Sequence, residues 1–128
     1  MQGLHLTADL HDCLCEARWM VDADLLGDWC LEAVRQAGLH PVGRLVHAFP
    51  ATPRGAGGVT ATVLLAESHL CVHTWPELRA VTVDVYVCNV EGDHSTRASV
   101  LLDRLLALFQ AAHVERHELR RGDIRAAF

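Results

Sequence analysis

Alternating apolar and polar residues predict most of the strands in this chain. The clearest run is 81–87, where valine stands at every odd position and Thr82, Asp84 and Tyr86 stand between. This two-residue period is typical of a strand with one buried face, because successive side chains of a strand point to opposite sides. Other apolar runs predict further strands at 4–10, 42–49, 59–66, 69–74 and 113–119.

Two segments carry apolar residues at the 3.6-residue spacing of a helix. The first is 22–37, with aspartates in its first turn and Gly38 at the position where a glycine commonly ends a helix. The second is 96–112, and either Ser95 or Asp93 is suited to cap its N-terminus. Both stripes are wide enough to pack against a sheet.

The predicted order of elements is β-α-β-β-β-β-α-β. Because each helix has one apolar stripe and the strands alternate, the two helices are expected to cover one face of a sheet. We therefore predict an α+β fold, a two-layer α/β sandwich with a mainly antiparallel sheet. Glycine and proline are concentrated at 50–58, which predicts a loop, and no linker or repeat divides residues 1–128 into more than one domain.

Composition narrows the classes of function. The chain is 51% hydrophobic, which excludes disorder as its main state, and its net charge of −5 argues against a nucleic-acid partner. No apolar run reaches the roughly 18 residues of a membrane span, and the first residues lack a signal-peptide pattern. We expect a cytoplasmic protein that binds neither nucleic acid nor membranes.

The absence of lysine excludes several kinds of chemistry. All 11 basic residues are arginines. No lysine amine can hold pyridoxal phosphate or a carbonyl substrate as a Schiff base, and phosphate loops that need lysine are excluded as well. The five cysteines are odd in number and lack the spacing of a disulfide framework, so reduced thiols are expected.

Reactive side chains are densest at 66–77, which reads AESHLCVHTWPE. His69, Cys71 and His73 alternate, so one strand face would carry nitrogen and sulfur donors of the kinds that zinc accepts. Cys88 or another histidine is a candidate fourth ligand, although no familiar metal spacing supplies it. A non-enzymatic metal-binding or regulatory module is one interpretation. Ser68 or Cys71 as a hydrolytic nucleophile is a second, although neither lies in a strand-turn-helix elbow. A core strand with polar ends is a third.

The whole segment is more specific than its parts. The pattern Glu-Ser-His-(aliphatic)-x-(aliphatic)-His-Thr-Trp-Pro-Glu at 67–77 resembles the self-processing site of the small prokaryotic S-adenosylmethionine decarboxylases, pyruvoyl enzymes of the polyamine pathway. The resemblance extends to GLHL at 3–6, HAF at 47–49, GVT at 58–60 and the segment 84–88.

The resemblance implies a way to make an electrophilic carbonyl without lysine or pyridoxal phosphate. The Ser68 hydroxyl attacks the carbonyl of Glu67, and elimination from the resulting ester cuts the chain into a β chain, 1–67, and an α chain, 68–128. The remnant of Ser68 is then a covalent pyruvoyl group, which captures the substrate amine as a Schiff base and delocalises the carbanion left when CO₂ departs. No metal is predicted. A strained turn at Glu67–Ser68 would hold the hydroxyl near the carbonyl.

The same resemblance assigns roles to residues beyond the cleaved bond. His73 transfers protons during processing, and Thr60 supports it at a position where serine is expected. Cys88 returns a proton to the substrate carbon after decarboxylation and helps processing. Because Ser68 and His73 are an odd number of residues apart, Ser68 must lie at or beyond the end of the strand that carries His73.

The substrate implied by the resemblance is S-adenosylmethionine, whose decarboxylated product donates aminopropyl groups in spermidine biosynthesis. Phe49 would stack on its adenine and Glu77 would accept hydrogen bonds from its ribose diol. The family pattern is not kept at 78–80, at Asn89 or at 90–97. Arginine or ornithine, which relatives of the family decarboxylate, therefore remain alternative substrates. Family members of this size are homodimers of processed protomers that share their active sites, and we expect the same here.

Overall fold

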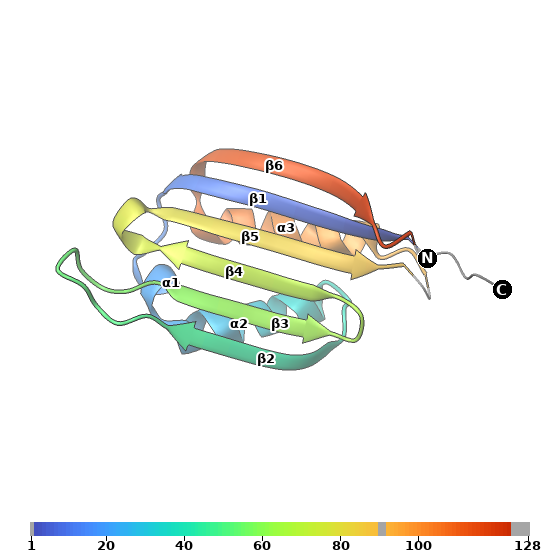
Figure 1. The fold of residues 1–128 in the computed structure, drawn as a ribbon, viewed down its shortest axis with the longest axis horizontal. Coiled ribbons are helices and arrows are strands. Elements are labelled where there is room, and N and C mark those ends of the chain that lie inside the picture. Colours follow the sequence, from blue (N-terminus) through green and yellow to red (C-terminus); the bar gives the residue numbers. More distant parts are fainter. Residues whose placement is uncertain (1, 90–91, 124–128) are drawn as a thin grey trace.

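Six antiparallel strands form one sheet in the computed structural model, which describes residues 2–89 and 92–123 (Figure 1). The strands are β1 (Gly3–Cys13), β2 (Pro41–Ala48), β3 (Val59–Leu65), β4 (His69–Trp75), β5 (Ala80–Cys88) and β6 (Ala111–Arg121). The helices are α1 (Arg18–Val21), α2 (Ala23–Gln36), α3 (Ser95–Phe109) and the short 3-10 helix η1 (Pro76–Leu78). Two parts of predicted segments lie outside the described residues. They are 124–128 of the predicted α chain and 90–91 of the segment 90–97, which does not keep the family pattern.

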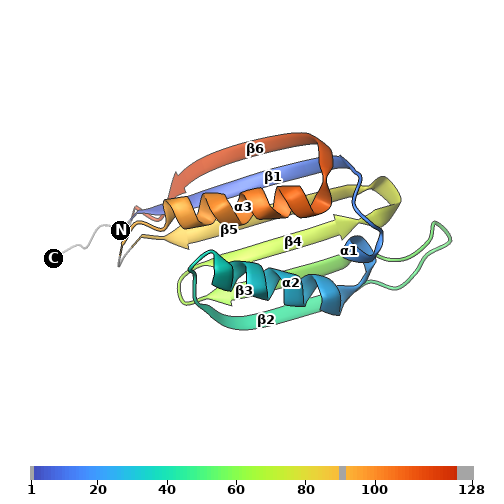
Figure 2. The same ribbon diagram turned by 180° about the vertical axis from the view of Figure 1, so that it is seen from behind.

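The sheet has the strand order β2-β3-β4-β5-β1-β6. The strands β2, β3, β4 and β5 are joined in sequence by hairpins. Strand β1 lies between β5 and β6 and pairs with both. Both long helices lie on the same side of the sheet, α2 against β2 and β3 and α3 against β5 and β1 (Figure 2). The predicted α+β sandwich is confirmed.

The core lies between the sheet and the two long helices. Leu26, Cys30 and Val34 of α2, and Leu101, Leu105 and Phe109 of α3, are fully buried there. Strands β1, β3, β4 and β5 supply alternate side chains to this layer, as the valines of β5 do. The remaining side chains point away from the helices, onto a surface we call the open face. Strands β1, β3, β4 and β5 contribute the following residues to it: His5, Thr7, Asp9, Thr60, Thr62, His69, Cys71, His73, Thr82, Asp84 and Tyr86.

The helix ends follow from local hydrogen bonding. Asp22 caps α2 by accepting a hydrogen bond from the backbone N–H of Leu25 at 3.0 Å. The N-cap residue of α3 is His94 rather than either predicted residue, but Asp93 accepts a hydrogen bond from the backbone N–H of Ser95 at 2.9 Å. Hydrogen bonds from Ser95 lower the pKa of the Asp93 carboxyl.

Helix α3 ends three residues before its predicted end, because Gln110 adopts the left-handed conformation with φ 50°. The chain then enters β6 at Ala111, so the last strand is longer than predicted. The helices α1 and η1 were not predicted, since a single turn has no periodic pattern. No helix in the described residues is long and apolar enough to cross a membrane.

Thr74 ties three elements together from inside the core. Its side chain is only 5% exposed. The backbone N–H of Val59 donates to Thr74 Oγ1 at 2.8 Å, and the Thr74 hydroxyl donates to the carbonyl of Met20 at 2.7 Å. The hydroxyl therefore fixes the start of β3 and the helix α1 against β4, next to His73.

Replacing Thr74 by valine is expected to destabilise the fold by about 2–4 kcal/mol, because it leaves a buried N–H and a buried carbonyl without their partner. Urea unfolding of an uncut Ser68→Ala chain with and without the change measures the loss. Thr7→Val on the open face is the matched control. Equal stability of the Thr74 and Thr7 variants would contradict the role given to this hydroxyl.

Candidate active site

Ser68 lies in the tight turn between β3 and β4, just before β4 begins at His69. The backbone N–H of Leu65 donates to the carbonyl of Ser68 at 2.9 Å and closes the turn. The backbone N–H of Cys88 donates to Ser68 Oγ at 3.0 Å. Ser68, Cys88 and Glu67 line one cavity of about 330 Å³ at this end of the sheet. The prediction that Ser68 lies beyond the strand end is confirmed.

The turn that holds Ser68 does not show the backbone strain expected of it. Among the described residues other than glycine, positive φ angles occur at Asp12, Arg79 and Gln110, and not at 66–68. Ser68 is half-buried and Glu67 is exposed. The hydroxyl is therefore positioned by the amide of Cys88 and by the hairpin hydrogen bond.

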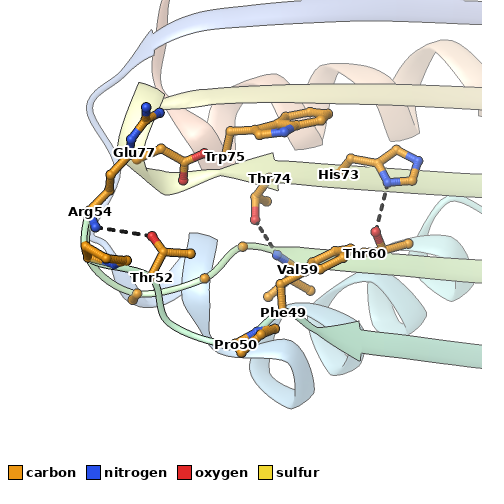
Figure 3. Close-up of a pocket in the computed structure, with 14 residues that line it drawn as sticks. Phe49, Pro50, Thr52, Arg54, Val59, Thr60, His73, Thr74, Trp75 and Glu77 are labelled. Atoms are coloured by element: carbon orange, nitrogen blue, oxygen red, sulfur yellow. Dashed lines mark hydrogen bonds between the residues drawn. The ribbon is translucent and has the colours of Figure 1, made fainter.

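His73 lies towards the other end of β4, directly opposite Thr60 of β3. Its Nδ1 is 2.9 Å from Thr60 Oγ1. Both residues line a second cavity of about 490 Å³, together with Phe49 and Glu77 (Figure 3). Phe49 is 51% exposed, which excludes a core role for its ring and leaves it available for stacking.

The predicted site residues thus fall into two groups at opposite ends of the sheet. The Ser68 group consists of Glu67, Ser68 and Cys88, and the His73 group consists of Phe49, Thr60, His73 and Glu77. Five strand positions separate Ser68 from His73, which corresponds to about 16 Å at 3.3 Å per residue. The two groups do not meet within a single copy of the chain.

The middle of the open face carries a cluster with one shared carboxylate. Asp84 Oδ2 is 3.0 Å from His5 Nε2 and 2.8 Å from His69 Nε2. Arg121 Nη1 is 3.1 Å from His5 Nδ1. Since a guanidinium can only donate, His5 carries its proton on Nε2 and donates it to Asp84.

This cluster changes the zinc interpretation made from the sequence. The predicted donors His69, Cys71 and His73 do not converge, because His69 contacts Asp84 whereas Cys71 Sγ is 3.3 Å from His73 Nε2. In the described part of the chain, the three residues close enough to share a metal are His5, His69 and Asp84. With the His5 proton on Nε2, that nitrogen is not available as a ligand while Arg121 keeps its contact.

Two features of these surfaces were not assigned from the sequence. Trp75, 39% exposed, and Arg54 line the cavity of the His73 group. Strand alternation places Trp75 on the open face, but only the fold of the 50–58 loop brings Arg54 to it. The His5–Asp84 contact joins residues 79 positions apart, which no local pattern predicts.

Comparison with known proteins finds similarity along almost the whole chain. The family model described as S-adenosylmethionine decarboxylase matches residues 4–122. An S-adenosylmethionine decarboxylase proenzyme of Acidithiobacillus ferrooxidans is 35% identical over 122 residues, covering 95% of this chain and 84% of the relative. One of Acetivibrio thermocellus is 32% identical over 120 residues, covering 94% and 88%. The crystal structure of the adenosylmethionine decarboxylase of Aquifex aeolicus is similar with a TM-score of 0.78 and 32% identity, covering 96% of this chain and 92% of the other.

Three of the five thiols are buried on the helix side of the sheet. Burial raises the pKa of Cys30 to about 12 and that of Cys13 to about 11, from the ordinary value of 9.0. Burial also raises the pKa of Cys15. These thiols are protonated and covered at neutral pH, as the interpretation of reduced core cysteines requires.

Iodoacetamide is expected to leave Cys13, Cys15 and Cys30 unmodified in the folded chain at pH 8, because the thiolate is the reactive form and a raised pKa makes it rarer. Raising the pH to 10 should change little for Cys13 and Cys30, whose pKa values lie higher still. Peptide mass spectrometry measures the modification, with the urea-unfolded chain as the control. Rapid labelling of Cys30 in folded protein would contradict its burial.

Proposed function

The chain belongs to the S-adenosylmethionine decarboxylase family and is a decarboxylase of S-adenosylmethionine, and we propose that it becomes active by cutting itself between Glu67 and Ser68. The observation that carries the proposal is the contact at 3.0 Å between Ser68 Oγ and the backbone amide of Cys88. Ser68 lies at the N-terminal end of the 67–77 motif. The contact joins the expected nucleophile to the strand end that carries the expected proton donor.

The self-cleavage uses the geometry of the turn. The amide of Cys88 donates to Ser68 Oγ, so the hydroxyl keeps its own proton free to leave when the oxygen attacks the Glu67 carbonyl. The peptide bond becomes an ester and frees the Ser68 nitrogen as an amine, and loss of the Ser68 Cα proton then expels the Glu67 carboxylate and leaves a dehydroalanine. This enamine tautomerises to an imine, which water hydrolyses to the pyruvoyl group with release of ammonia. Cleavage leaves chains of 67 residues, 1–67, and 61 residues, 68–128 (128 − 67 = 61). The pyruvoyl group formed from Ser68 supplies the electron sink for decarboxylation.

Cys88 lies at this same end of the sheet. It lines the cavity of the Ser68 group and is 7% exposed, so its thiol is shielded from bulk water. A shielded thiol beside Ser68 supports the proposal that Cys88 donates the proton to the substrate carbon after CO₂ leaves.

The cavity of the His73 group suits the nucleoside part of the substrate. Its volume of about 490 Å³ lies in the range of small-molecule sites. Exposed Phe49 offers a face for stacking on adenine, and the Glu77 carboxylate can accept hydrogen bonds from the ribose diol. Neither free arginine nor ornithine has a nucleobase and a ribose diol to fill this cavity, which favours S-adenosylmethionine.

One protomer alone separates the nucleoside cavity from Ser68, so a complete site requires two copies of the chain. A two-fold axis that runs across the strands, with two open faces in contact, lays the Ser68 group of each protomer over the His73 group of its partner. The open face also carries exposed Leu45, Leu64 and Leu119, which such a contact would cover. We propose a homodimer with two shared active sites.

The Ser68→Ala chain is expected to remain a single polypeptide of 128 residues and to release no CO₂ from S-adenosylmethionine, because no hydroxyl remains to attack Glu67. Intact-protein mass spectrometry and a CO₂-release assay measure both effects. The unaltered chain should give two fragments and turn over S-adenosylmethionine but not arginine or ornithine. An uncut chain with full activity would refute self-cleavage.

Mixing two inactive variants tests the shared site. Neither Ser68→Ala nor His73→Ala should cleave when expressed alone, whereas coexpression should restore cleavage of the His73→Ala chain, since its Ser68 meets the native His73 of the partner. The matched control coexpresses the His73→Ala chain with a chain that carries both Ser68→Ala and His73→Ala, because no native His73 is then present and no cleavage is expected. Mass spectrometry of the fragments reads the result. Failure of the first pair to complement would contradict a site shared in this way.

A further inference from the structure

We propose that Cys71 is a positioning residue for His73: its thiol donates to Nε2 of the imidazole, which holds the ring proton on Nδ1 and keeps the Nε2 lone pair for proton transfer. The inference rests on the proposed function of His73 in self-cleavage. None of the roles above uses Cys71, which lies two residues before His73 on the same face of β4.

The contacts form a chain of four side chains on the open face. Thr60 Oγ1 is 2.9 Å from His73 Nδ1, and His73 Nε2 is 3.3 Å from Cys71 Sγ. Cys71 Sγ is in turn 3.5 Å from Thr62 Oγ1. All four side chains are half-buried; two come from β3 and two from the paired strand β4. Both ring nitrogens of His73 are thus hydrogen-bonded within the protomer.

Hydrogen bonding through this chain runs in one of two orders, since neutral imidazole has one donor and one acceptor nitrogen. In the order we assign, Nδ1–H donates to Thr60, the Cys71 thiol donates to Nε2, and the Thr62 hydroxyl donates to Sγ. In the reverse order Nε2 carries the proton and cannot accept another. Only the assigned order prepares His73 as a base at Nε2, the ring nitrogen farther from the backbone.

The weakness of the thiol as a donor fits a temporary partner. An approaching ester displaces the S–H from Nε2 at small cost, whereas the shorter Thr60 contact stays in place. The Ser68 Cα–H bond of the partner protomer then breaks, its electron pair expels the Glu67 carboxylate, and the proton is held on Nε2. The imidazolium that forms still donates from Nδ1 to Thr60. Cys71 touches neither substrate nor ester and acts only through the ring.

Three substitutions and a control separate this role from simple packing. Cys71→Val and the smaller Cys71→Ala remove the thiol donor, whereas Cys71→Ser replaces it with a hydroxyl donor. The control, Thr82→Val, removes a hydroxyl directly opposite His73 on β5 that is not part of the chain of contacts. Loss of one hydrogen bond is expected to slow self-cleavage about five- to tenfold in the valine and alanine variants. The serine variant should cut itself at a rate within about twofold of the unaltered chain. The Thr82→Val variant should cut itself at the same rate as the unaltered chain.

Ring ¹⁵N spectra of His73 in the uncut Ser68→Ala chain provide a readout that packing would not move. We expect the Nδ1-protonated tautomer when Cys71 is unchanged and after Cys71→Ser, and a mixture of tautomers after Cys71→Val or Cys71→Ala. Urea unfolding of the same proteins identifies any variant that is not folded, in which case the other apolar variant is used.

The outcomes distinguish this inference from the function on which it rests. If the unaltered chain does not cut itself, the proposed function fails whatever Cys71 does. If it cuts itself and the folded valine and alanine variants do so at the same rate with the same tautomer, the positioning role is overturned. A proton on Nε2 in the Ser68→Ala chain, or slow cleavage that Cys71→Ser does not rescue, overturns it as well.

Discussion

The pairing of β4 with its two neighbours decides where the reactive side chains of this protein lie. Antiparallel register sets His73 opposite Thr60 and sets the Ser68 turn beside the end of β5. Because side chains alternate, the same register sends Leu70, Val72 and Thr74 into the core and leaves the intervening positions on the open face. A slip of one residue would bury the histidines and expose the aliphatic side chains. The burial of the aliphatic side chains therefore also determines which reactive side chains lie on the open face.

Local patterns predicted the elements well because each one depends on its own residues. The alternating valines of β5 and the apolar stripes of α2 and α3 define strands and helices whose boundaries lie within a few residues of those predicted. The exception at the end of α3 depends on one left-handed residue, Gln110, for which the sequence has no glycine signal. Single-turn helices such as α1 have too few residues to show a period.

The site was predicted less completely, for a physical reason. The motif at 67–77 and its flanking segments gave the predicted site residues, and the odd spacing of Ser68 and His73 already indicated that Ser68 lies past the strand end. The meeting of His5 with Asp84 depends on pairing between strands far apart in the sequence, and the chain alone does not display it. The expected strain at Glu67–Ser68 is replaced by ordinary hairpin geometry and a single anchoring hydrogen bond.

That anchor belongs to the main chain, and this has an evolutionary consequence. Every residue except proline presents the same N–H at position 88, so sequence drift there alters the thiol without removing the donor that orients Ser68. Under the proposed roles, a change at position 88 alters the thiol that protonates the product but keeps the amide that orients Ser68 for self-cleavage. Selection on maturation and selection on turnover would then act on different atoms of one residue.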